Sequence, residues 1–213
     1  MDSSVEALKG WAMSHLQWFG QSAFRIRSES GRAVFIDPWH VPPAAGPADL
    51  ILVTHPHGDH YDRKAIEGLR KAGTVVVLPG SIAGKEQTGI AAGQSLQIGT
   101  IRVTGVAAYN LTRRFHPKSG NWLGYVVEVD GMKVYHAGDT DAIPEMRDLR
   151  PDIALLPIGG MFAMDWRAGA QAAVLLKAAL SIPMHYGMLL GGRGAGRRFS
   201  RRVGTGSMVM PRG

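Results

Sequence analysis

Short hydrophobic runs recur along most of the chain, and clusters of glycine, proline, asparagine or serine separate them. Runs of this length, alternating or continuous, predict β-strands, some of them buried on both faces. In the first half we expect strands at 15–19, 22–28, 32–37, 49–54 and 74–79. In the second half we expect them at 94–98, 101–109, 125–131, 132–138, 153–158, 182–187 and 207–211.

Helical periodicity appears between these strands. A short N-terminal helix would place Val5, Leu8 and Trp11 or Ala12 on one face. The other expected helices lie at 62–72, 144–149 and 165–180 and in the arginine-rich segment 193–204. Strands outnumber helices in both halves, and no linker or low-complexity segment divides them. The pattern predicts a two-sheet core flanked by helices.

The composition favours one globular domain covering residues 1–213. At 213 residues and 45% hydrophobic content, the chain is long enough for one sizeable core. Asp2 and Glu6 stand where a signal peptide would carry basic residues, and no apolar run approaches the roughly 20 residues of a spanning helix. We therefore expect a cytoplasmic protein without a membrane partner. Because the chain has no cysteine, any metal must be held by histidine and carboxylate.

The positive charge is concentrated at the C-terminal end. Of the net charge of +7, six arginines between Arg193 and Gly213 contribute +6 without an acidic residue, and the remainder of the chain carries only +1. This segment is either a patch that meets the phosphates of a nucleic acid or an exposed helix whose Phe199 and Val203 face the core. We favour the exposed helix.

Residues 54–60 read THPHGDH and directly follow a hydrophobic run. His55 and His57 are two positions apart, so in extended chain they project to the same side. A turn at Gly58 would bring the next aspartate and histidine round to a second position. Four potential ligands then point into one small volume at the carboxyl end of a strand, which predicts a metal site.

The segment HPHGDH resembles the H-x-H-x-D-H signature of the metallo-β-lactamase superfamily of hydrolases. The later motifs occur in the matching order, with YHAGDT at 135–140 and MHYG at 184–187. FIDPW, HAGDT and ALLPIGG further resemble the branch of ascorbate-6-phosphate lactonase-like proteins and uncharacterised metal-dependent hydrolases. The resemblance implies an α/β fold, a four-layer αββα sandwich in which two mixed β-sheets are flanked by helices.

The resemblance also implies a dinuclear metal site. One metal would be bound by His55 and His57, and the other by Asp59, His60 and His185. A bridging carboxylate would come from Asp139. Two zinc ions are the first expectation, with Mn2+ or Fe2+ as alternatives, because nitrogen and oxygen ligands alone do not fix the metal.

The third ligand of the first metal is less clear in the sequence. His116 lies at a suitable distance before Asp139, whereas Asn110 stands where some lactonase-like relatives place their histidine. We favour His116, because a neutral imidazole is a better zinc ligand than a carboxamide.

The implied chemistry is hydrolysis. Two such ions share a water whose pKa falls toward ~7, which makes hydroxide available as a nucleophile at neutral pH. Asp59 would take up or redirect the proton, Asp139 would hold the pair together, and Tyr186 is a candidate donor to the oxyanion. Asn110 and Lys118 are candidates for binding the substrate.

Two further polar residues have open roles. Asp37 either hydrogen-bonds a ligating histidine and fixes its tautomer or caps a turn before Pro38. His136 would point to the opposite side of the strand from Asp139, so we expect a structural role. The segment 161–166 would either wall the substrate cavity or pack in the core.

The sequence supports several functions to different degrees. We expect hydrolysis of a small ester or lactone, with or without a phosphate, by a protein that could form a homo-oligomer. A phosphodiesterase or nuclease is the alternative, because the same metal pair suits phosphoryl transfer and the tail is basic. A β-lactamase side activity and a binding protein without turnover are further readings, since fold and metal site alone do not assign a substrate.

Overall fold

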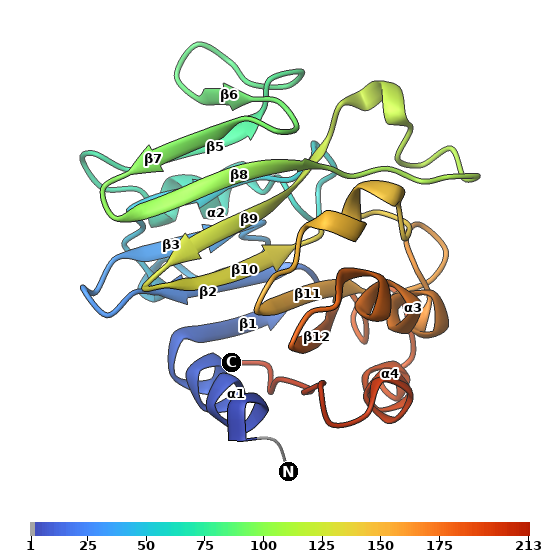
Figure 1. Cartoon of the computed structure of the whole chain (residues 1–213). Helices are drawn as coiled ribbons and strands as arrows, with labels where there is room; N and C mark the ends of the chain where they lie inside the picture. The colour runs from blue at the N-terminus through green and yellow to red at the C-terminus, as the bar shows by residue number, and fades with distance from the viewer. Residues whose placement is uncertain (1–2) are drawn as a thin grey trace.

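A computed structural model describes residues 3–213 and contains two six-stranded β-sheets that pack face to face (Figure 1). The first sheet follows the chain order β1-β2-β3-β4-β5-β6. Its strands are β1 Leu16–Gly20, β2 Ala23–Arg27, β3 Ala33–Ile36, β4 Leu50–Leu52, β5 Val75–Pro79 and β6 Thr88–Ile90. Pairing is antiparallel from β1 to β3 and parallel from β3 to β6, so the sheet is mixed.

The second sheet repeats this arrangement in the reverse chain order, β12-β11-β10-β9-β8-β7. Its strands are β7 Ser95–Ile98, β8 Ile101–Ala107, β9 Leu123–Val129, β10 Met132–His136, β11 Ile153–Pro157 and β12 Leu180–Met184. Strands β7 to β10 pair antiparallel, and β10 to β12 pair parallel. The parallel strands β10 to β12 therefore end at the same edge of the sheet.

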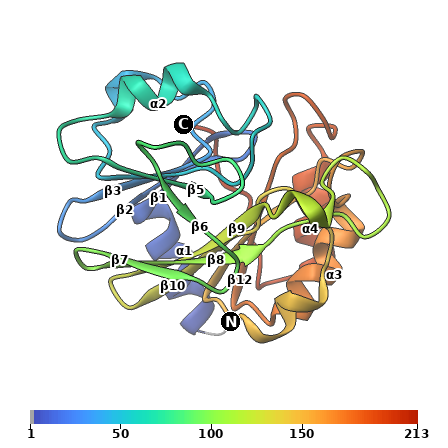
Figure 2. The same ribbon diagram turned by 90° about the horizontal axis from the view of Figure 1, so that it is seen from above.

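Helices cover the outer faces of the paired sheets. The α-helices are α1 Ser3–His15, α2 Arg63–Leu69, α3 Trp166–Leu176 and α4 Ala195–Val203. Short 3-10 helices span Pro43–Ala45, Lys118–Gly120 and Pro144–Asp148. Figure 2 shows α2 on one side of the paired sheets and α3 on the other. Helix α3 packs on β11 and α4 on β12, while α1 contacts both β1 and β12.

Strand β4 is buried on both faces, which explains the continuous hydrophobic run that precedes residues 54–60. Leu50 and Leu52 face the core between the two sheets, whereas Ile51 faces α2 and packs with Ile66 and Leu69. All of these side chains are at most 4% exposed. Fully burying each such side chain contributes roughly 1.5–3 kcal/mol, so the strand that carries the site is firmly held.

The elements differ from the sequence prediction at several places. The strand expected at 182–187 spans Leu180–Met184, so His185 lies beyond its end, and the helix expected at 144–149 is the 3-10 helix Pro144–Asp148. Strand β6 was not expected, because its sequence TGI is too short to give a pattern. Helix α3 ends at Leu176 and not at 180, since Lys177 takes a left-handed conformation with φ 50° and β12 then begins. The strand expected at 207–211 is wrong: the tail makes only single bridges, Ser207 with Ser181 and Arg212 with Trp18.

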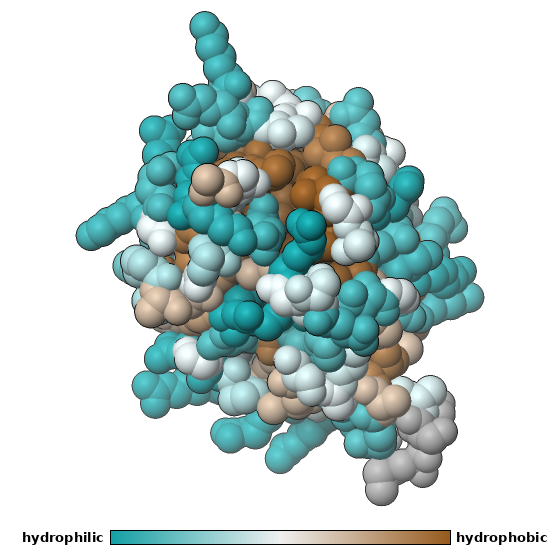
Figure 3. Space-filling model, turned by 90° about the vertical axis from the view of Figure 1, so that its left-hand side faces the viewer, coloured by the Kyte–Doolittle hydropathy of each residue, from teal (hydrophilic) through white to brown (hydrophobic). Residues whose placement is uncertain are grey.

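The surface on the left of Figure 1 is mainly hydrophilic, with hydrophobic side chains gathered in a recess near the upper centre of Figure 3. In the part of the chain that the structure describes, no helix combines the length and apolar character needed to cross a membrane.

Candidate metal centre

The loops that follow β4, β10 and β12 carry most of the predicted ligands. Residues 55–60 follow β4, Asp139 follows β10, and His185 follows β12. The main-chain oxygen of His57 accepts hydrogen bonds from the amides of His60 (3.0 Å) and Tyr61 (2.8 Å), which closes the turn. Gly58 is not among the residues with a positive φ, so this turn does not depend on the glycine as we had expected.

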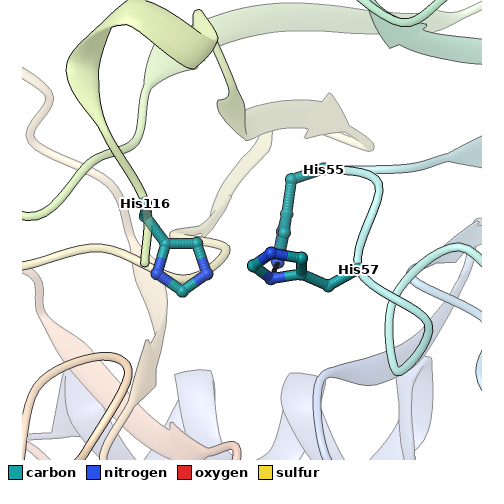
Figure 4. A group of neighbouring side chains, drawn as sticks. All are labelled: His55, His57 and His116. Atoms are coloured by element: carbon teal, nitrogen blue, oxygen red, sulfur yellow. Dashed lines mark hydrogen bonds between the residues drawn. The ribbon is translucent and has the colours of Figure 1, made fainter. Parts of the chain in front are cut away.

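Two groups of three ligands without a shared member form at this edge, and a third group, His55, His60 and Asp139, shares one histidine with each of them. The first contains His55, His57 and His116, and the second contains Asp59, His60 and His185. Within each group, one ligand atom per residue lies within 4.8 Å of the others. Figure 4 shows the imidazole of His116, from the loop between β8 and β9, opposite those of His55 and His57.

Asp139 lies between the two groups. Its Oδ2 is 3.5 Å from Nε2 of His116 in the first group. The same oxygen is 3.7 Å from Nε2 of His60 and 3.2 Å from Nε2 of His185 in the second. One carboxylate thus faces ligand atoms of both groups.

Buried polar atoms without hydrogen-bond partners show, independently of the sequence motif, that these residues fit metal ions. Nε2 of His60, Nε2 of His116 and Oδ1 of Asp139 are buried and have no hydrogen-bond partner among the described residues. Each such atom costs about 1–3 kcal/mol when it is left unsatisfied. Divalent cations bound by nitrogen and oxygen ligands would satisfy all three, and imidazole and carboxylate are ligands that zinc, manganese and iron accept.

Asp37 orients histidines of both groups. Nδ1 of His60 donates to Oδ2 of Asp37 over 2.7 Å, which leaves Nε2 free for a metal. The hydroxyl of Thr54 donates to the same oxygen over 2.7 Å and lies 2.9 Å from Nδ1 of His55. Because this hydroxyl uses its proton on Asp37, it accepts the Nδ1 proton of His55. Of the two roles considered for Asp37, the structure therefore supports hydrogen bonding to the predicted histidine ligands over capping of a turn.

Asn110 performs a similar task for His116. Nδ1 of His116 lies 3.1 Å from Oδ1 of Asn110 and 3.0 Å from the main-chain oxygen of Phe162. Both oxygens accept, so Nε2 of His116 faces the centre. Asn110 is only 6% exposed and holds the histidine; it is not a member of either ligand group.

Burial and the neighbouring carboxylates set the charges of the histidines. Burial lowers the pKa of His55 well below its ordinary value and that of His116 to about 4, so both are neutral at neutral pH. Burial also opposes protonation of His185, but the adjacent Asp139 carboxylate outweighs it and raises the pKa of His185 to about 9. The metal-free centre therefore holds a proton where a cation would bind.

Gln21 belongs to the centre, although sequence reasoning did not single it out. It lies in the turn between β1 and β2, has φ 47° and is fully buried. Its Nε2 donates to Oδ2 of Asp59 over 2.8 Å and lies 3.0 Å from Nε2 of His185. Its main-chain oxygen accepts from the amide of His185 over 2.7 Å. A lone glutamine in a turn belongs to no motif, so the sequence carried no signal for it.

Two predicted site residues lie elsewhere. The ring of Tyr186 stacks on Trp18 at 5.3 Å, and its hydroxyl lies against Gly196 of α4. His185 lies beyond the end of β12 and has φ 57°, and Tyr186 lines a separate hollow with Trp18 and Arg193 that contains none of the predicted ligands. The placement does not support a catalytic role for Tyr186.

Lys118 is bound outside the cavity that contains the ligands. Its Nζ lies 3.2 Å from the hydroxyl of Tyr109 and 3.3 Å from Oε1 of Glu145. It lines a separate hollow with these two residues, so its predicted contact with substrate is not supported at the centre. His136 has the structural role that we expected: its Nε2 donates to the main-chain oxygen of Ser22 over 2.9 Å.

The beta-lactamase superfamily domain model matches residues 15–185. The chain belongs to this superfamily. A relative from Thermococcus onnurineus, named UPF0173 metal-dependent hydrolase, is 36% identical over 82% of this chain and 85% of its own length. A relative of the same name from Myxococcus xanthus is 39% identical, covering 82% of this chain and 71% of its own length.

Solved structures of two other proteins share the fold. A putative metal-dependent hydrolase from Parabacteroides distasonis is similar with a TM-score of 0.81 and 29% identity, covering 91% of each chain. The metallo hydrolase Igni18 from Ignicoccus hospitalis is similar with a TM-score of 0.78 and 28% identity, covering 93% of this chain and 95% of its own. The expected two mixed sheets flanked by helices are thereby confirmed, as is the family resemblance.

Proposed function

We propose that this protein is a hydrolase that binds two divalent metal ions, zinc in the first instance, and cleaves a small ester or lactone. The observation that carries the proposal is the position of Asp139, whose Oδ2 faces His116 of one ligand group and His60 and His185 of the other. The names of the relatives, metal-dependent hydrolases, support the reaction class.

In this proposal each residue has a defined task. His55, His57 and His116 would hold the first ion, and Asp59, His60 and His185 would hold the second. The Asp139 carboxylate, which faces histidines of both groups, would serve both ions. When bound, such ions activate a water as nucleophile and stabilise negative charge on the oxygen of the substrate.

Asp59 is placed to handle a proton. Its side chain is 23% exposed and lines the cavity at the centre. Burial would raise the pKa of this carboxyl, but the hydrogen bond with His185 and the charge of His60 outweigh burial and hold it well below its ordinary value. In the metal-free centre Asp59 is thus an anion at neutral pH. As a carboxylate that lines the cavity, Asp59 would accept the proton of the attacking water and pass it to the leaving group.

The test combines metal analysis with a substrate panel. Protein purified without chelator, and the same protein after zinc or manganese is added, would be analysed for metal and assayed with ester, lactone, phosphodiester and β-lactam substrates. We expect about two ions per chain and turnover of an ester or lactone. The proposal would be contradicted by a metal content below one ion per chain that does not rise when zinc or manganese is added.

Two variants and a control locate the ions. His116→Ala should lower metal content, because it removes a ligand. Asn110→Ala should lower it less, since the main-chain oxygen of Phe162 still holds Nδ1 of His116. His15→Ala is the matched control, because His15 stacks on Trp11 and belongs to neither group. Greater metal loss in Asn110→Ala than in His116→Ala would show that the first group is wrongly assigned.

A further inference from the structure

The cavity over the two ligand groups has one chemically distinctive wall. It encloses about 380 Å³, toward the lower end of the size range of small-molecule sites. Its floor is formed by three of the predicted ligands, His57, Asp59 and Asp139. The rest of its lining is apolar and consists of Phe115, Phe162, Leu189 and Leu190.

Exposed hydrophobic side chains are concentrated on the loops that carry the apolar lining of this cavity. In the described part of the chain, eight large hydrophobic residues are exposed, and five of them lie on the loops at 110–121, 159–164 and 186–193. These five are Leu111, Phe115, Met161, Met188 and Leu189. Phe115 and Leu189 line the cavity, whereas Met188 lines a separate hollow with Trp18 and Tyr186. Exposed apolar side chains that line a site mark the place where an apolar ligand is bound.

The apolar wall is built into the same contacts that hold the ligands. The rings of Phe115 and Phe162 meet edge to face at 4.6 Å. Phe115 directly precedes His116, and the main-chain oxygen of Phe162 accepts the Nδ1 proton of that histidine. The loop with Leu189 and Leu190 follows His185 and is closed by a 2.8 Å hydrogen bond from the amide of Gly187 to the oxygen of Leu190. The wall is therefore fixed relative to the ligand groups.

Among the residues that the structure describes, no lysine or arginine lines this cavity, whose charged lining residues are both acidic. The guanidinium of Arg113 is bound elsewhere, to the main-chain oxygen of Ala163 (2.7 Å) and to Asp141 (3.3 Å). Arg193 lines a different hollow with Trp18 and Tyr186. A phosphate on the distal part of a substrate would meet an apolar wall without a cationic partner, and burying such a charge is costly.

We infer that the substrate presents a neutral, apolar group, an acyl chain or an aromatic ring, to the wall of Phe115, Phe162, Leu189 and Leu190. This inference rests on the proposed function and narrows its substrate class. The reacting carbonyl lies over the ligand groups and the apolar group lies against the wall. The phosphorylated lactone that the family branch suggested is then disfavoured.

The experiment measures binding of hydroxamates, which share one metal-binding head and differ in the tail. Calorimetry with metal-loaded protein of known metal content would compare acetohydroxamate, butyrohydroxamate, hexanohydroxamate and octanohydroxamate. We expect each added methylene that enters the cavity to tighten binding by up to about fourfold. Succinate monohydroxamate, which has the length of butyrohydroxamate but a charged end, should bind at least about tenfold more weakly than its neutral counterpart.

Variants assign the effect to the wall. In Leu189→Ala or Phe115→Ala, the affinity ratio of octanohydroxamate to acetohydroxamate should fall by about tenfold. Val174→Ala is the matched control, because Val174 is an exposed hydrophobic residue on α3 and does not line this cavity. In this control the affinity ratio of octanohydroxamate to acetohydroxamate should equal that of the unmodified protein. Metal content is measured in every sample.

The outcomes separate the two proposals. Equal affinity for all tail lengths, or tighter binding of the charged tail, would contradict the inference that the substrate carries an apolar group. The proposed metal centre would not be affected by that result. If the protein does not retain metal and no hydroxamate binds, the proposed function is contradicted, and the inference with it.

Discussion

At the scale of single residues, the ligand atoms are aimed by side chains that are not ligands themselves. Asp37 reaches His60 directly and His55 through Thr54, one histidine from each group. Asn110 fixes His116 in the same way. A histidine whose second nitrogen is held by an acceptor has a defined tautomer and orientation.

Replacing Asp37 by asparagine should therefore weaken both ligand groups. Asparagine has one oxygen in place of two, so it cannot accept from the amide and hydroxyl of Thr54 and from His60 as the aspartate does. We expect zinc affinity to fall by about 10–100-fold in Asp37→Asn. Competition with a chromogenic chelator measures this change. Asp130→Asn is the control, because Asp130 lies in an exposed turn, where it accepts from the amide of Glu29. Equal zinc affinity in both variants would refute the role of Asp37.

Proton release on metal binding is a second prediction at this scale. With a pKa of about 9, His185 carries a proton at neutral pH in the metal-free protein and must lose it to bind a cation. Burial would lower the pKa of His60, but the Asp139 and Asp37 carboxylates outweigh burial and raise it well above its ordinary value. His60 must therefore also lose a proton when it binds a cation. Apparent affinity should then rise with pH by about tenfold per unit for each released proton, until pH passes the folded pKa. His55 and His116 are already neutral and add nothing to this release at neutral pH.

Calorimetry of zinc binding in two buffers of different ionisation enthalpy counts the protons. The expected result at neutral pH is net release that diminishes above about pH 9. Metal uptake without proton release at neutral pH would show that His185 and His60 are not protonated in the metal-free centre.

The predicted ligands were accessible from sequence, but the residues that aim them were not. A compact motif at 54–60 places several ligands in one turn, so their types and spacing suffice to suggest a site. Gln21 is 38 positions from Asp59 and 164 from His185, and it meets them only because the β1–β2 turn packs against both loops. Tyr186 shows the same limit, because its nearness to His185 in sequence did not show that its ring stacks on Trp18.

At the scale of elements, long hydrophobic runs gave the strands reliably, because a strand that is buried on both faces has few alternatives. Strand β6 has three residues and could not be seen in this way. The tail at 207–211 has a strand-like pattern but forms only single bridges, since pairing depends on what lies beside it. Helix α4 agrees with the exposed-helix reading, with Phe199 buried and Arg197, Arg198, Arg201 and Arg202 exposed.

Changing the four α4 arginines to glutamine should thus leave hydrolysis of a small substrate within about twofold, because exposed substitutions shift free energies by about 0.5 kcal/mol. The measurement is kcat/KM at low and high salt, beside metal content. Cleavage of RNA or DNA that weakens steeply with salt, and disappears in this variant while metal is retained, would favour the nuclease alternative.

At the scale of the whole molecule, the centre joins the two sheets. His55, His57, Asp59 and His60 follow a strand of the first sheet, whereas Asp139 and His185 follow strands of the second. The repeated mixed-sheet pattern brings these strand ends to a common edge. A cation bound there interacts with both halves at once, so its binding free energy adds to the stability of the complete fold.

Removing metal should therefore lower the unfolding temperature of the whole protein. With free metal at about a hundredfold above the dissociation constant, binding stabilises the folded state by about 2.7 kcal/mol per site. For a chain of this size, that corresponds to a decrease in Tm of about 5–10 °C for each ion removed, or about 10–20 °C when chelation removes both. Calorimetric scans with and without chelator measure it, and re-addition of zinc is the control. An unchanged Tm in protein shown to have lost its metal would contradict a centre that links both sheets.

The C-terminal tail also joins the sheets, at their edges. Ser207 bridges to Ser181 of β12, and Arg212 bridges to Trp18 of β1. The amide of Gly213 donates to the oxygen of Trp18 over 2.9 Å. Both strands are terminal in their sheets, and unpaired backbone groups on a terminal strand are templates on which another chain can add a strand. By occupying some of these groups, the irregular tail protects the folded protein against edge-to-edge aggregation.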